Sequence, residues 1–71
     1  MSEIDNMIAA LEFGMKAVNA CWFWQGDKKR SAKVQLTSAI HCASQAIEHR
    51  GIKDKTLEDK LQQAETVWKR L

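Results

Sequence analysis

Apolar side chains recur along this chain at alternating intervals of four and three residues, the spacing of one face of an α-helix that packs in a bundle. The first of three such stripes consists of Ile4, Ile8, Leu11, Met15, Val18 and Trp22. The second, rich in alanine, consists of Ala32, Leu36, Ala39, Ile40, Ala43, Ala46 and Ile47. The third consists of Leu57, Leu61, Ala64, Trp68 and Leu71. The pattern therefore predicts an all-α protein with three helices.

Glycine residues separate the three stripes. The chain has no proline, and Gly26 and Gly51 lie between the stripes, where a helix is expected to end. We therefore predict helices over residues 3–24, 31–50 and 57–70, within a single domain that covers the whole chain. Because all three stripes share the bundle spacing, the helices should pack nearly antiparallel, as an up-down three-helix bundle.

Polar residues ahead of each stripe predict the helix N-caps. Ser2 suits the first helix and Thr56 the third, because a hydroxyl there can accept a hydrogen bond from a free backbone N–H. The second helix has two candidates, Asp27 and Ser31. Ser31 is favoured, because the cations of residues 28–30 would oppose the helix dipole if they lay in the first turn.

A second apolar stripe runs along the opposite side of the first predicted helix. It consists of Phe13, Ala17, Ala20 and Trp24, and Phe23 lies between the two stripes. A chain this short cannot enclose a helix that is apolar on two sides. We expect these five residues to form an interface with a second copy or another partner, with Trp24 as its anchor. The alternative is that Trp24 covers the end of its own helix.

Chain length and cysteine content bear on stability and location. A domain of 71 residues buries a small core, so self-association, most simply as a dimer, is expected to stabilise it. Cys21 and Cys42 lack metal-ligand spacing and are interpreted as buried thiols of a cytoplasmic protein. Glu12 and Lys16 interrupt the apolar run before it reaches membrane-spanning length, and neither a targeting segment nor a membrane partner is expected.

Charge is unevenly distributed, although the whole chain carries only +2. Residues 1–24 have a net charge of −2, residues 25–55 have +4, and the remainder is neutral. The basic group consists of Lys28, Lys29, Arg30 and Lys33. It is either a solvated charged turn or a site for phosphate, beside which Trp24 could stack on a base.

The sequence contains little that indicates a catalytic or metal-binding site. No pairing of a nucleophile with a base is readable, and three short helices enclose no substrate-sized pocket. His41 and Glu48, like Cys42 and His49, lie seven residues apart, which separates them by about 10 Å on a helix, too far to share one metal ion. We therefore expect no enzymatic activity, no metal and no cofactor.

The stretch of residues 30–51, which contains the second predicted helix, loosely resembles the alanine-rich second helix of the phage-encoded helical-hairpin sponges that sequester cyclic nucleotides. The resemblance covers Leu36, Ala39, Ala43, Ala46 and Ile47. It is confined to this helix, and no site residue is carried over from it.

Together these patterns indicate a small non-enzymatic interaction protein. We expect a homo-oligomer that binds a protein partner through apolar helix faces, as small regulators and inhibitors of phage or mobile-element type do. The alternative is an oligomer that binds the phosphates of a nucleotide or nucleic acid through Trp24 and residues 28–33, as a nucleotide sponge would.

Overall fold

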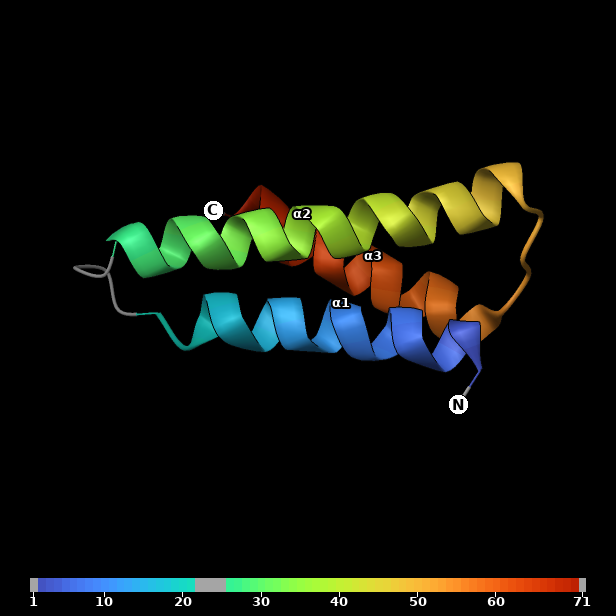
Figure 1. Ribbon diagram of the computed structural model, residues 1–71, viewed down its shortest axis with the longest axis horizontal. Coiled ribbons are helices and arrows are strands. Elements are labelled where there is room, and N and C mark those ends of the chain that lie inside the picture. Colours follow the sequence, from blue (N-terminus) through green and yellow to red (C-terminus); the bar gives the residue numbers. More distant parts are fainter. Residues whose placement is uncertain (1, 22–25, 71) are drawn as a thin grey trace.

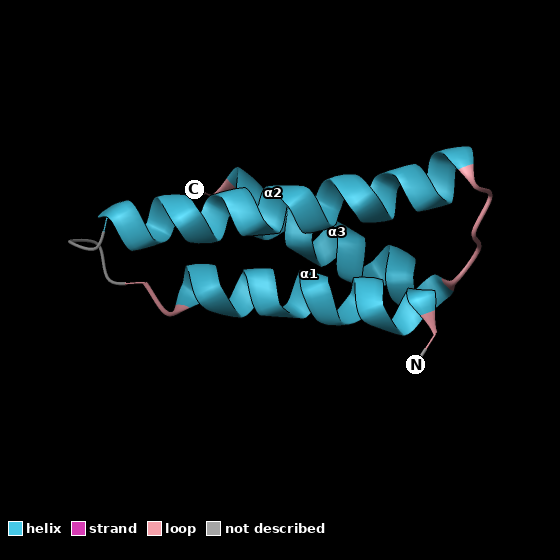
Figure 2. Cartoon of the chain, viewed as in Figure 1, coloured by secondary structure: helices cyan, strands magenta, loops and turns pink. Residues whose placement is uncertain are grey.

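Three α-helices form a bundle in the computed structural model, which describes residues 2–21 and 26–70. The helices are α1 (Glu3–Asn19), α2 (Gly26–His49) and α3 (Lys55–Lys69). α1 and α2 lie side by side and antiparallel, and α3 runs back along both of them (Figure 1). Within the described ranges all regular structure is helical (Figure 2). The predicted three-helix bundle is confirmed.

The first helix ends earlier than its apolar periodicity predicts. α1 stops at Asn19, and the N–H of the capping residue Ala20 donates to the carbonyl of Lys16 at 2.9 Å. Cys21 is no longer helical but still packs against the core, which is how the apolar pattern continues past the helix end. The remaining predicted helical positions, 22–24, lie outside the described residues.

The second helix begins at Gly26, so the prediction that Ser31 is its N-cap is wrong. Lys28, Lys29 and Arg30 therefore lie in the first turns of α2. All three are exposed, so water and salt screen their unfavourable interaction with the helix dipole. Asp27, an acidic residue of the same first turn, offsets part of it.

Side-chain caps begin the other two helices. Ser2 caps α1 as predicted, and its hydroxyl accepts a hydrogen bond from the N–H of Asp5 at 3.1 Å. α3 is capped by Asp54, whose carboxylate accepts from the N–H of Leu57 at 2.9 Å. Thr56, predicted as this cap, lies inside the helix because the carboxylate two residues earlier already satisfies the free backbone donor.

The core follows the predicted stripes. Its large, fully buried side chains are Leu11, Leu36 and Leu57, one from each helix, and alanines of α2 and α3 fill the space between them. Two stripe residues, Trp22 and Leu71, lie outside the described part of the chain. A core built from three leucines, Val18 and alanines is small, as the chain length predicts.

Gly14 brings α1 and α2 into direct backbone contact. It is buried, and a Cβ at this position would lie 2.9 Å from Cδ1 and 3.0 Å from Cα of Leu36. No larger residue could occupy the site without moving the two helices apart. The spacing of α1 and α2 therefore depends on this glycine.

In the described part of the chain, two ion pairs connect the helices. Arg50 binds the carboxylate of Glu3 through both of its terminal nitrogens, with Nη2 2.7 Å from Oε2. These hydrogen bonds and the opposite charge lower the pKa of Glu3 and raise the pKa of Arg50. Lys60 and Glu12 lie 3.2 Å apart and join α3 to α1. The first pair is exposed and the second partly exposed, so both orient the helices more than they stabilise them.

Candidate interaction surfaces

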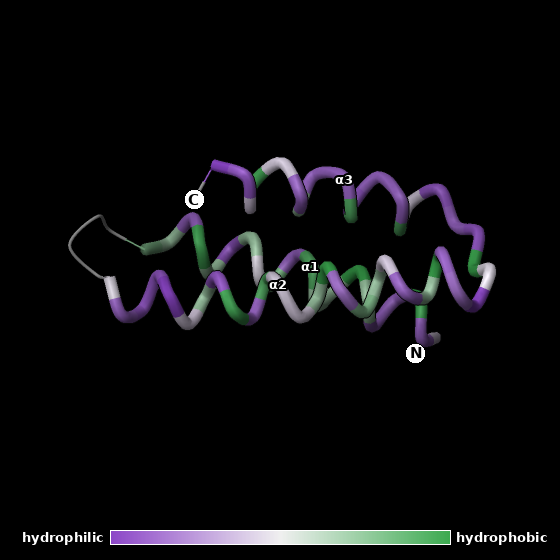
Figure 3. Tube along the Cα trace, turned by 90° about the horizontal axis from the view of Figure 1, so that it is seen from above, coloured by the Kyte–Doolittle hydropathy of each residue, from purple (hydrophilic) through white to green (hydrophobic). Residues whose placement is uncertain are grey.

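One side of the α1–α2 pair is left uncovered. α3 lies on a single side of the pair, as the perpendicular view shows (Figure 3). On the other side, two open grooves of about 610 and 390 Å³ lie between α1 and α2, and Gln35 lines both. We call this surface the α1/α2 face; its small and apolar lining side chains include Met7, Ala10, Ala17, Ser31, Ser38 and Ala39.

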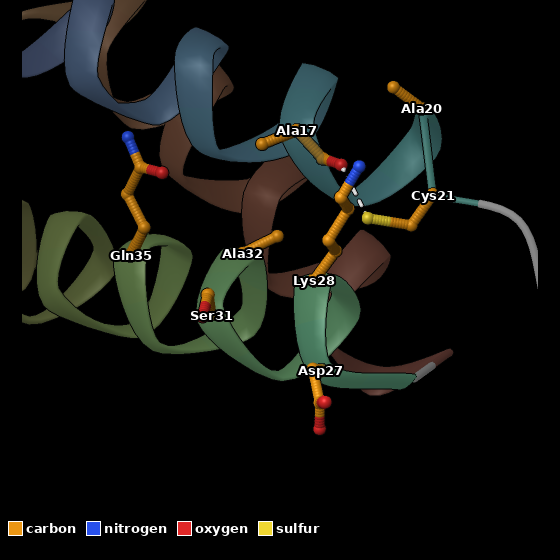
Figure 4. A pocket seen from close by; sticks show the side chains of 8 residues that line it. All are labelled: Ala17, Ala20, Cys21, Asp27, Lys28, Ser31, Ala32 and Gln35. Carbon is orange, nitrogen blue, oxygen red and sulfur yellow. Dashed lines mark hydrogen bonds between the residues drawn. The ribbon is translucent and has the colours of Figure 1, made fainter. Parts of the chain in front are cut away.

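The groove near the end of α1 combines small side chains with one cation. Lys28 extends from α2 toward α1, whereas Asp27 points away (Figure 4). The thiol of Cys21 donates a hydrogen bond to the carbonyl of Ala17 at 3.2 Å, which holds the chain against the groove. Between them lie Ala17 and Ala32, whose short side chains leave the groove open.

The predicted interface residues occupy different environments. Phe13 is 67% exposed, and since it lies three residues from Ala10 and four from Ala17 it borders the α1/α2 face. Ala17 lines the α1/α2 face and also packs partly against the core, and Ala20 is exposed beyond the helix end. The other two members, Phe23 and Trp24, lie outside the described residues.

Folding collects the basic residues at one end of the bundle. The start of α2, the end of α1 and the end of α3 lie together there (Figure 1). This basic end holds Lys16, Lys28, Lys29, Arg30, Lys33, Lys69 and Arg70, against Asp27 and Glu65. Its formal net charge is therefore +5.

The opposite end of the bundle is acidic. It holds Glu3, Asp5, Glu48, Asp54, Glu58 and Asp59, against Arg50, Lys53 and Lys55. Its formal net charge is −3, and the pair of Glu12 and Lys60 between the two ends is neutral. The charge is thus separated along the longest dimension of the molecule, which is 40 Å.

Trp68 lies beside the basic end, although its position in the third stripe predicts a core residue. It is 39% exposed, and its indole Nε1–H donates to Oγ1 of Thr37 at 2.9 Å. Nζ of Lys33 lies 5.1 Å from the centre of its ring. A groove of about 480 Å³ between α2 and α3 is lined by Trp68 together with Ile40 and Lys69. Sequence reasoning missed this site, although Lys69 and Arg70 directly follow the tryptophan.

The four predicted anion-binding residues divide between two surfaces. Lys28 faces the groove between α1 and α2. Lys29, Arg30 and Lys33 line a separate depression of about 320 Å³ that includes Gly26. The second surface continues toward Trp68 through the contact of Lys33 with its ring.

Other polar candidates remain dispersed. Cys42 is exposed rather than buried, which corrects the prediction of two buried thiols, and Cys21 is half-buried. His41 and His49 are exposed on α2. Across residues 2–21 and 26–70, no three His, Cys, Asp or Glu side chains are grouped closely enough to hold a metal ion. No helix in these ranges is both long and apolar enough to cross a bilayer.

No protein-family description matches this chain, and comparisons with curated proteins and with solved structures gave no match either.

Proposed function

We propose that this protein is a small non-enzymatic interaction protein that works as a homodimer and acts by binding another macromolecule, as small regulators and inhibitors do. The observation that carries the dimer is the uncovered α1/α2 face, with Phe13 67% exposed at its border. A large exposed aromatic beside a surface of small side chains is typical of a protein interface.

A second copy of the chain is the occupant that fits this face. The core is small, so apolar surface buried by association would add to a stability that one chain barely supplies. Alanine and serine side chains allow another helix pair to approach closely. In a two-fold interface the same patch serves both copies, so Phe13, near the middle of α1, would lie close to its counterpart.

Charge favours an antiparallel arrangement of the two copies. The basic end of one copy would then lie against the acidic end of the other, whereas a parallel dimer would place like charges together. A two-fold axis near Gln35, which both grooves share, brings Cys42 of one copy toward Lys28 of the other. In this arrangement, each copy covers both grooves of the other copy.

Sedimentation equilibrium of matched variants tests the dimer. We expect the wild type to be dimeric at micromolar concentration and Phe13→Asp to weaken association by about 30-fold or more, the loss typical of a hot-spot residue. Gln63→Asp is the control, because Gln63 is exposed on α3, which lies on the other side of the α1–α2 pair (Figure 3), and this variant should remain dimeric. A monomeric wild type, or equal behaviour of the two variants, would reject the proposal.

A further inference from the structure

We propose that the basic end and Trp68 form a binding surface for single-stranded nucleic acid. The inference rests on the proposed role as an interaction protein but not on the dimer, because it uses the α2/α3 side of the molecule. Two features carry it: cations that folding gathers from separate segments, and a half-exposed tryptophan among them.

The cations form an extended strip rather than a pocket. Lys29 and Arg30 lie at the start of α2, Lys33 one turn further, and Lys69 and Arg70 at the end of α3. A single phosphate could contact few of these side chains at once, whereas successive phosphates of a strand could contact one after another. Glu65, in the groove beneath Trp68, is the acidic residue that a strand would have to avoid.

Trp68 supplies a platform on which a base can stack. The hydrogen bond from its indole to Thr37 fixes the orientation of the ring. Nζ of Lys33 lies over the ring, 5.1 Å from its centre, in the position that a stacked base would take. An arriving base would displace this ammonium group, which would then be free to bind the neighbouring phosphate.

Single strands fit this surface better than duplexes or mononucleotides. The bases of a duplex are already stacked on one another and cannot reach the face of Trp68. A mononucleotide would use the ring but only one or two of the cations. The affinity should therefore rise with strand length until the strip of cations is filled.

Binding is measured by fluorescence anisotropy of a labelled oligothymidylate of about ten nucleotides, a length within the usual site sizes. We expect the logarithm of the binding constant to fall with the logarithm of salt concentration at a slope of about −3, which corresponds to about four neutralised phosphates.

Two double charge reversals separate local contacts from overall charge. Arg30→Glu with Lys69→Glu should lower the affinity by about tenfold or more and roughly halve the salt slope. Lys53→Glu with Lys55→Glu makes the same change in net charge at the acidic end. Because the ends are separated along a 40 Å axis and the screening length is about 8 Å at physiological salt, this control should bind like the wild type.

Trp68 is tested by two substitutions that keep an apolar side chain in place. Trp68→Leu should lose about 5- to 150-fold in affinity, the range for one stacked base, while Trp68→Phe should keep most of the binding. With Trp22→Phe and Trp24→Phe as background, the fluorescence of Trp68 should be quenched on addition of the strand. Circular dichroism checks that each variant is folded.

Four results would overturn the inference: no binding by the folded wild type at low salt, equal losses in the two charge-reversal variants, equal affinity for a mononucleotide or a duplex, or unchanged binding by Trp68→Leu. Measuring the strand on the Phe13→Asp variant keeps the two proposals apart. Binding with no dimer, or a dimer with no binding, each rejects one proposal and leaves the other standing.

Discussion

Gly14 shows how one residue can determine the distance between two helices. Adding a methyl group there would favour the helix by about 1 kcal/mol through intrinsic propensity. The same methyl would lie 3.0 Å from Cα of Leu36, a backbone atom that cannot rotate away, and overpacking costs about 1–3 kcal/mol. The balance of these two effects predicts that Gly14→Ala lowers the free energy of unfolding by up to about 2 kcal/mol, as measured by urea denaturation.

The matched control is Gly26→Ala. Among residues 2–21 and 26–70, nothing lies within 4 Å of a Cβ built on this first residue of α2, so the protein should keep its stability or gain up to about 1 kcal/mol. A gain in both variants would mean that the contact between Gly14 and Leu36 relaxes easily.

Trp68 shows that the spacing of apolar residues does not predict how deeply a single side chain is buried. Its position in the stripe predicts a side chain that faces the other helices, and the indole does contact α2. It does not predict how much of the indole α2 covers, and the part of α2 that it meets carries Lys33 and Thr37 beside the apolar Ile40. The candidate site beside Trp68 therefore emerges only when the two helices are placed together.

At the scale of the helix, the cap of α3 can be tested against the cap expected from sequence. Asp54→Ala removes the acceptor for the N–H of Leu57 and should lower the free energy of unfolding by about 1 kcal/mol. Thr56→Ala, inside the helix, should change it by less than about 0.5 kcal/mol. Urea or thermal denaturation measures both, and a larger loss for Thr56→Ala would show that the hydroxyl is the true cap.

The helices themselves are predictable from sequence because stripes of apolar residues extend over several turns. Their ends are less predictable, because each depends on a few competing weak interactions. No glycine or proline marks the end of α1 at Asn19, and Cys21 keeps the apolar pattern while already outside the helix. At the start of α2, screening of exposed cations weakens the dipole argument that favours Ser31.

At the scale of the molecule, charge separation is a property of the fold. Counted along the sequence, the last segment of the chain is neutral. Folding places Lys69 and Arg70 at the basic end with Lys16, while Glu58 and Asp59 of the same segment lie at the acidic end. No count over contiguous segments could have revealed the difference between +5 and −3.

The antiparallel dimer makes a prediction about the two cysteines. Cys42 lines the groove at the acidic end and Cys21 the groove at the basic end, so the proposed two-fold axis brings Cys21 of one copy toward Cys42 of the other. Mild oxidation should therefore give a covalent dimer with a Cys21–Cys42 linkage, identified by mass spectrometry of peptides. Either Cys21→Ser or Cys42→Ser should abolish it, and linkages between identical cysteines would contradict the antiparallel orientation.

The separation of charge along the 40 Å axis also has a kinetic consequence. Two molecules that carry opposite charge at their ends exert a torque on each other before they touch, so most encounters of the proposed dimer begin already aligned. Salt would then act mainly on the rate at which the copies meet, while the packed alanines and Phe13 would set the time for which they stay together.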